Sequence, residues 1–415
     1  MIQTSQNDEQ QLNMTFCVLS ALAIIMVAAG HLGYSILTMG ELFPYYSFHI
    51  PLFMFISGYF YRESEEEHPV LYIKKKVFRL LVPYLIWNLV YGIIAAAMRT
   101  CGFTMGEEIS FRTLFIEPFL HGYQFIYNYA SWFVPVLFIV EILNLSARLI
   151  LKKVGDLLIL RHGKASGKGE STDPGRLAEG LTHDGWLAAT EWIMLVGSLI
   201  VGMITVQLAI GGHVWGNYKA AGRILFLFPC YQMGRFYHEK LEKHDTLGNL
   251  PYFAVVLTVQ VLLNICCSGL AFSSVWCTGF ASGPVIPYVT SVTGIAFWLR
   301  IARVLTPAAG VSREVRYLGR NTYAVMMHHV MVFMLIKAVI AGIASTTGLC
   351  GDFDFEQLHS NIDYIYLVRG SEQFKMVYLA AGVILPLALQ YGLDRAGKGI
   401  RSRSQNKAVR FAIRK

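Results

Sequence analysis

Several histidines stand in long apolar stretches, where a titratable ring is unusual. His31 follows "LSALAIIMVAAG", His49 opens "HIPLFMFISGYF", and His329 lies within "YAVMMHHVMVFMLI". Histidine is the side chain best suited to exchange a proton near neutral pH. Ionisable groups inside a membrane usually face a cavity and serve a function. A single such histidine could equally have a structural role, as a hydrogen bond between two helices. The relative positions of the histidines therefore help to decide between the two roles.

A rise of about 1.5 Å per residue places each ring along its expected helix. If the first helix enters from the cytoplasm near residue 15, His31 lies about 24 Å along it. His49 then lies about 8 Å below the outer end of the next helix. Because the connection is short, the two helices should be neighbours, and we expect both rings to share one outer-half cavity. His329 should lie about 12 Å from the cytoplasmic end of its helix.

The composition indicates a polytopic membrane protein with an all-α fold. Of the 415 residues, 54% are hydrophobic and 15% charged, against about 25% charged in soluble domains. The net charge of +8 is read as loop charge facing anionic lipid rather than nucleic acid. The seven cysteines have no CxxC spacing, so we expect no metal site.

About ten apolar segments approach the roughly 20 residues that a bilayer-spanning helix needs. The aromatic stretch 111–127 is interrupted by Glu117, Pro118 and His121, and is predicted to be interfacial or re-entrant. Residues 152–185, rich in Gly, Ser and Lys, are predicted to form a flexible loop. The ten predicted spans are 15–37, 44–61, 77–98, 131–150, 187–210, 222–238, 250–270, 283–300, 321–344 and 376–394.

The basic residues predict the orientation of these spans. With the N-terminus inside, every even-numbered connection is rich in Lys and Arg, and so is the tail after residue 394. The odd-numbered connections are poor in Lys and Arg, or balanced by acidic residues. The positive-inside rule therefore predicts that both termini are cytoplasmic and that the protein is a multi-pass component of the cell membrane.

A basic cluster, "YIKKKVFRLL", borders the third span. It can be read as a topology signal beside lipid headgroups, or as a site for a phosphate-bearing cytosolic substrate. Arg79 is the best single candidate for such a site, because it lies inside the apolar run, where an unpaired charge is costly.

Five motifs, in this order and spacing, resemble the acyltransferase 3 family, and most of all its fucose 4-O-acetylase-like branch. They are "AIIMVAAGH", "FHIPLFMFISGYFY", "KKKVFRLLVPYLIW", "WFVPVLF" and "LGRNTYAVMMHH". The resemblance covers about 15–394, which implies one membrane domain between a cytoplasmic tail, 1–14, and a basic tail, 395–415.

The resemblance implies an integral membrane O-acyltransferase in the lipid bilayer, with no permanently bound cofactor. Its donor would be acetyl-CoA or another acyl-CoA, and its acceptor a hydroxyl of a sugar or surface glycan. The family's essential first-helix histidine corresponds to His31, and His49 lies in its second motif. The third histidine corresponds best to His329, with His328 left open. We assign acid–base or positioning roles to His31 and His49, and donor contacts to Lys76, Arg79, Arg320 and His329.

One position departs from the family pattern. The basic residue usually found eleven positions before the first-helix histidine is replaced here by Ser20. If that residue contacts the donor, another cation must replace it, and Arg79 is the candidate. His31 could act as a general base or be acylated itself, and the sequence leaves both open.

Other classes of protein remain as alternatives. The histidines could form the proton relay of a transporter, although no inverted repeat or pair of broken helices is visible. A related membrane module that binds or passes amino acids or sugars is the other alternative.

Overall fold

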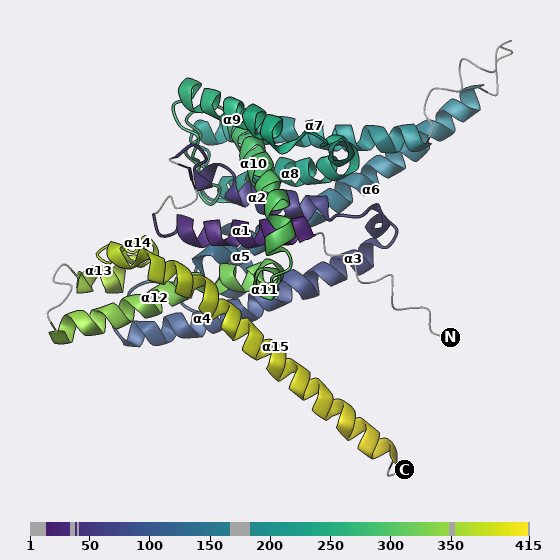
Figure 1. Ribbon diagram of the computed structural model, residues 1–415. Coiled ribbons are helices and arrows are strands. Elements are labelled where there is room, and N and C mark those ends of the chain that lie inside the picture. Colours follow the sequence, from purple (N-terminus) through teal and green to yellow (C-terminus); the bar gives the residue numbers. More distant parts are fainter. Residues whose placement is uncertain (1–13, 34–37, 40, 167–182, 348–352, 414–415) are drawn as a thin grey trace.

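The computed structural model describes residues 14–33, 38–39, 41–166, 183–347 and 353–413 (Figure 1). Within these ranges the chain forms helices and no named strand, with one isolated antiparallel bridge between Ser273 and Thr278. The main helices are α1 Met14–Gly30, α2 His49–Tyr59, α3 Pro69–Lys76, α4 Val82–Thr100, α5 Glu117–Leu120, α6 Phe133–Ser166, α7 His183–Ile210, α8 Asn217–Phe236, α9 Asn249–Cys266, α10 Ile286–Ala309, α11 Arg313–Arg320, α12 Thr322–Thr347, α13 Phe355–Ser360, α14 Ile362–Tyr366 and α15 Lys375–Ile413.

Seven helical stretches in the described ranges are long and apolar enough to cross a membrane. This confirms the all-helical, multi-pass character that the composition predicts, while the count of ten and the cytoplasmic termini stay predictions. The seven stretches are Pro69–Thr100, Tyr129–Arg161, Gly185–Ile210, Asn249–Cys266, Ile286–Ala309, Thr322–Thr347 and Glu372–Gly397.

The other three predicted spans form helices that are short or charged. The span 15–37 is helical only to Gly30, in the 17-residue α1. The span 44–61 is divided into a 3₁₀ turn, Tyr45–Ser47, and the 11-residue α2. The third, 222–238, corresponds to the 20-residue α8, whose polar content is high because it carries Lys219, Arg223 and Arg235.

Buried ion pairs explain how α8 tolerates one of these charges. Arg148 of α6 donates to both carboxylate oxygens of Glu191 on α7, at 2.8 Å each. Arg235 of α8 adds a contact of 3.4 Å between its Nε and Glu191 Oε1. All three side chains are buried. Charges buried at membrane depth are paired in this way because an isolated one would be costly.

Two predictions about connections have different outcomes. The stretch 111–127 forms a π-helical turn, Arg112–Ile116, followed by the one-turn helix α5, and both are too short to cross a bilayer. The prediction of a flexible loop over 152–185 is wrong where the structure describes it. Helix α6 continues to Ser166 and α7 begins at His183, because residues 152–166 keep a helix-forming mixture of Leu, Lys and Arg. Residues 167–182 lie outside the described ranges.

Helices α1 and α2 occupy the middle of the bundle. In Figure 1 they lie between the group α7–α10 and the group α4, α12 and α15. Helix α2 touches α8 through backbone atoms: a Cβ at Gly58 would come within 1.9 Å of the Tyr231 carbonyl oxygen. A Cβ at Gly234 would come equally close, 1.9 Å, to the Phe55 carbonyl oxygen. Small residues thus permit close helix packing at this contact.

Candidate functional site

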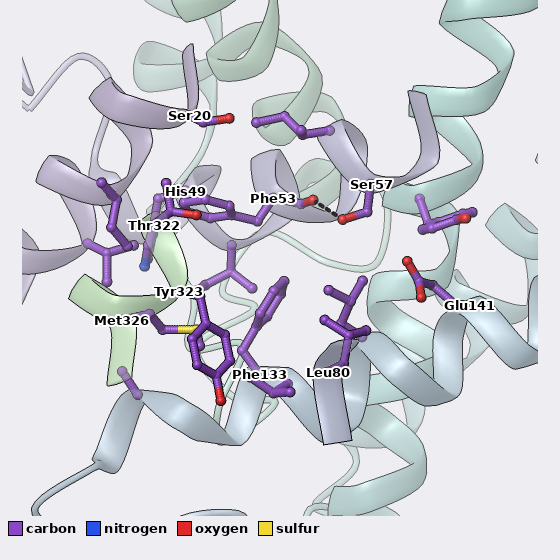
Figure 2. A pocket seen from close by; sticks show the side chains of 18 of the residues that line it. Ser20, His49, Phe53, Ser57, Leu80, Phe133, Glu141, Thr322, Tyr323 and Met326 are labelled. Carbon is purple, nitrogen blue, oxygen red and sulfur yellow. Dashed lines mark hydrogen bonds between the residues drawn. The ribbon is translucent and has the colours of Figure 1, made fainter. Parts of the chain in front are cut away.

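One elongated cavity of about 800 Å³ runs along α1 and α2. Helix α1 lines it with Ser20, Ile24, Val27 and, one residue beyond its end, His31. These positions are three or four residues apart, so they form one face of the helix. Helix α2 contributes His49, Phe53 and Ser57 at intervals of four residues. Figure 2 shows these α2 side chains opposite Phe133 and Leu80.

The cavity has two chemically different ends. We call the first the histidine end, lined by His31, Tyr46, His49, Tyr129 and Tyr366. We call the second the basic rim, lined by Arg62, Lys75, Lys76, Arg79 and Arg320. Ser20 and His31 are eleven residues apart on α1, which corresponds to about 16 Å. The cavity therefore connects a cationic surface with a buried group of imidazoles.

At the histidine end, His31 contacts two other rings. Its imidazole stacks on that of His329, with ring centroids 4.9 Å apart and an angle of 6° between the planes. In addition, the Tyr366 hydroxyl lies 3.3 Å from His31 Nε2. His31 Nδ1 is buried without a hydrogen-bond partner in the described structure. The ring is thus fixed in position while one nitrogen stays unengaged.

His49 and His329 have tautomers that their backbone contacts define. His49 Nδ1 lies 2.5 Å from the Tyr45 carbonyl oxygen, and His329 Nδ1 lies 2.7 Å from that of Val325. A carbonyl oxygen only accepts, so in each ring Nδ1 carries the proton. Nε2 of each neutral ring then holds a lone pair that can take a proton or accept a hydrogen bond.

The structure separates His329 from His328. His328 Nδ1 pairs with the Tyr91 hydroxyl at 2.9 Å, and its ring packs on Trp87. Neither histidine lines the cavity, and His329 reaches it only by stacking on His31, which does. The expected depth of His329, about 12 Å from the cytoplasmic end of its helix, stays a prediction. The stacking of its ring on His31 was not predicted. Helix α12 begins beside the middle of α1, because the short α11 packs on the first turns of α1 at Gly319 and Cys17.

The cations of the basic rim differ in how they are paired. Lys76 forms an ion pair with buried Glu141 at 2.5 Å, and Lys75 pairs with Glu65 at 3.5 Å. Arg79 and Arg320 line the cavity, are exposed, and form no ion pair with any described residue. They are therefore the cations best placed to bind an anion. Lys76, with its charge neutralised, is a weaker candidate than the sequence suggested.

Ser20 lies on the cavity wall where the family pattern has a basic residue. Its hydroxyl donates to the Phe16 carbonyl at 2.7 Å, within its own helix. Arg320, at the end of α11, lines the same cavity, and α11 packs on the first turns of α1. Arg235 of α8 does not line the cavity and belongs to the buried Glu191 cluster.

Loops held by buried cations close the histidine end. Arg223 donates through Nε to the Val275 carbonyl at 2.7 Å and through Nη1 to the His121 carbonyl at 2.6 Å. Lys219 donates to the Tyr123 hydroxyl. Residues 121–129 are thus fixed to residues 273–278, which include the cavity-lining Ser273, Ser274 and Val275.

An acidic residue anchors the neighbouring turn. Burial alone would raise the pKa of the Glu117 carboxyl, but hydrogen bonds from Arg112 and His121 hold that pKa below its usual value. The carboxylate therefore stays charged near neutral pH and fixes the Arg112–Ile116 turn to α5.

The sequence reasoning missed Tyr366 and Glu141. Tyr366 lies within the long predicted connection between the last two spans, and no local pattern distinguishes it from other loop tyrosines. Glu141 did carry a signal, because a carboxylate in the middle of the apolar stretch 131–150 is uncommon. Figure 2 shows Glu141 facing the cavity from α6, with Ser57 of α2 nearby.

Comparisons with known proteins identify part of the chain. Residues 18–160 match the family model Acyl_transf_3, described as an acyltransferase domain. A search of curated proteins and a search of solved structures each found no match. The matched segment carries His31, His49, Lys76 and Arg79, whereas Arg320 and His329 lie beyond it. The resemblance to the acyltransferase 3 family is thus confirmed for residues 18–160, and this domain together with the apolar helices indicates a multi-pass membrane acyltransferase.

Proposed function

We propose that this protein transfers an acyl group, most simply acetyl, from acyl-CoA to a hydroxyl of a sugar or surface glycan. The observation that carries the proposal is the cavity itself, which joins the exposed Arg79 and Arg320 to the buried His31. A donor with phosphates at one end and a thioester at the other matches this order of charged and acid–base groups.

In the proposed reaction His31 is the general base. The acceptor hydroxyl attacks the carbonyl carbon of the thioester while His31 takes its proton, and a C–O bond forms. The tetrahedral intermediate then breaks its C–S bond, and the proton held by His31 passes to the departing thiolate to give the CoA thiol. His329 and Tyr366 act as positioning residues, since one stacks on the imidazole and the other contacts its Nε2. His49, with a lone pair on Nε2, would orient the acceptor.

At the basic rim, the positive charges would bind the phosphates of the donor. The phosphates of the donor would bind Arg79 and Arg320, the cations of the basic rim without a carboxylate partner among the described residues. The predicted orientation puts this rim at the cytoplasmic surface, where acyl-CoA is made. The acceptor would reach the histidine end from the other side.

The test is acyl transfer by a His31→Gln variant. Glutamine keeps hydrogen-bonding capacity and similar size but takes no proton at neutral pH, so the rate should fall by roughly 10²–10⁴-fold. Binding of acetyl-CoA by the purified protein should persist. The readout in cells is the O-acetyl content of surface glycan in a deletion strain complemented with each variant. His213→Gln, at an exposed histidine away from the cavity, is the matched control.

Two results would contradict the proposal. Near-full activity of His31→Gln would show that His31 is not the general base and that its ring only packs between helices. A wild-type protein that binds no acyl-CoA but moves a solute or protons across vesicles would favour a transporter.

A further inference from the structure

Three polar groups at the basic end of the cavity have unmet hydrogen-bonding capacity. They come from different helices: Tyr72 from α3, Glu141 from α6 and Tyr231 from α8. All three residues line the cavity, and they are 3%, 2% and 0% exposed, respectively. By hydrogen-bond geometry, Glu141 Oε2 and both phenol oxygens have no partner among the described residues, although the two phenols lie close enough to interact with each other.

Such unmet groups are uncommon and costly. A buried donor or acceptor without a partner costs roughly 1–3 kcal/mol, and more when it is charged. Each one in a native protein therefore calls for an explanation, such as a ligand that completes it. Three of them from three helices on one cavity wall point to a binding surface rather than to an isolated defect. We call Tyr72, Glu141 and Tyr231 the collar.

The collar is held in place by its neighbours. Glu141 Oε1 pairs with Lys76 Nζ, and that ammonium lies 5.1 Å from the centre of the Tyr72 ring. Tyr61 packs edge-on against both collar tyrosines, with centroids at 5.9 Å from Tyr72 and 6.5 Å from Tyr231. The carboxylate charge is already balanced by Lys76, so the collar suits a neutral ligand that donates and accepts hydrogen bonds.

We propose that the collar binds the pantetheine arm of acyl-CoA, with Glu141 accepting from an amide N–H and the two phenols bonding to amide and hydroxyl groups. The inference rests on the proposed function and assigns part of its donor site. Secondary amides present one donor and one acceptor each, which matches a carboxylate oxygen beside two hydroxyls.

Depth distinguishes the arm from the nucleotide. The free cations Arg79 and Arg320 are exposed, whereas every collar residue is buried. Lys76, the cation beside the collar, is already paired with Glu141, so phosphates would stay with the exposed cations. The neutral arm is the part of the donor that must enter the cavity for its thioester to reach His31.

Tyr72→Phe and Tyr231→Phe test the collar without disturbing its shape. Each removes one buried hydroxyl that has no partner, so thermal stability should be unchanged or slightly higher. Binding of acetyl-CoA should weaken about 2- to 13-fold per hydroxyl, the equivalent of about 0.5–1.5 kcal/mol for a neutral hydrogen bond. The matched control is Tyr84→Phe, at a residue that does not line the cavity. Its hydroxyl is equally buried and, like those of the collar, has no hydrogen-bond partner by geometry among the described residues.

Three probes separate the possible outcomes by isothermal titration with the detergent-solubilised protein: acetyl-CoA, S-acetylpantetheine and 3′,5′-ADP. We expect the two variants to lose affinity for acetyl-CoA and S-acetylpantetheine, and to bind 3′,5′-ADP like the wild type. If both variants bind acetyl-CoA with wild-type affinity, the collar does not bind the donor, and the proposed function is unaffected. Equal losses for 3′,5′-ADP overturn the assignment to the arm. A wild-type protein that binds none of the probes refutes the donor of the proposed function, and the collar with it.

Discussion

The contact between α2 and α8 should decide whether the cavity is formed correctly. At Gly58 an added Cβ would lie 1.9 Å from the Tyr231 carbonyl oxygen and 2.8 Å from its carbon. Non-bonded heavy atoms prefer about 3.5–4.0 Å, so Gly58→Ala must separate the two backbones by about 1.5–2 Å. The obstacle is main chain in a packed helix, which cannot turn aside as a flexible side chain could.

The expected cost is at the upper end of the overpacking range, about 1–3 kcal/mol. The same shift moves the opposite face of α2. His49, Phe53 and Ser57, which line the cavity, lie on that face. A displacement of about 1 Å in a catalytic site can cost roughly 10²-fold in rate. Gly58→Ala should therefore reduce both thermal stability and acyl transfer.

The control is Gly197→Ala at an exposed position of α7, where an added Cβ meets nothing within 4 Å. Alanine is favoured over glycine in a helix by about 1 kcal/mol, so this variant should be neutral or more stable. The assay is thermal unfolding of each purified variant in the same detergent, paired with the transfer rate. If Gly58→Ala melts and reacts like Gly197→Ala, the close contact of α2 with α8 does not exist in the folded protein.

Three further predictions concern the donor, the orientation and pH. Arg79→Ala and Arg320→Ala should each weaken acetyl-CoA binding roughly 10- to 150-fold, as expected for charge-assisted hydrogen bonds to phosphate of about 1.5–3 kcal/mol; unchanged affinity in both would move the donor site away from the rim. In a cysteine-free background, a cysteine replacing His213 should be labelled from outside intact cells and one replacing Lys243 should not, and equal labelling would reverse or abolish the predicted orientation. Because the folded pKa of Glu117 is lowered from 4.5, its stabilising contribution is present above pH 4.5 and is lost as the pH falls through the lower folded value. The melting temperatures of wild type and Glu117→Gln should therefore differ at neutral pH and converge in acid, and a constant difference would contradict this.

Much of the architecture follows from local properties of the chain. Apolar runs of membrane length predict helices wherever they occur, because a bilayer forces the backbone to satisfy its own hydrogen bonds. The short spacing between the motifs of His31 and His49 was enough to predict neighbouring helices and a shared cavity. The sequence motifs were also sufficient to predict the acyltransferase domain that the family model matches over residues 18–160.

Other features depend on which distant segments pack together, and only the tertiary structure decided them. Periodicity could not reveal that α1 and α2 are short or that α11 brings the start of α12 beside the middle of α1. It therefore could not predict that His329 stacks on His31, since depth along one helix says nothing about offsets between helices. Tyr366 approaches His31 across 335 positions of sequence, and Lys76 is neutralised by Glu141 from another helix. A sequence specifies which groups are available for chemistry, but pairing and charge balance arise from packing between helices, which no local pattern encodes.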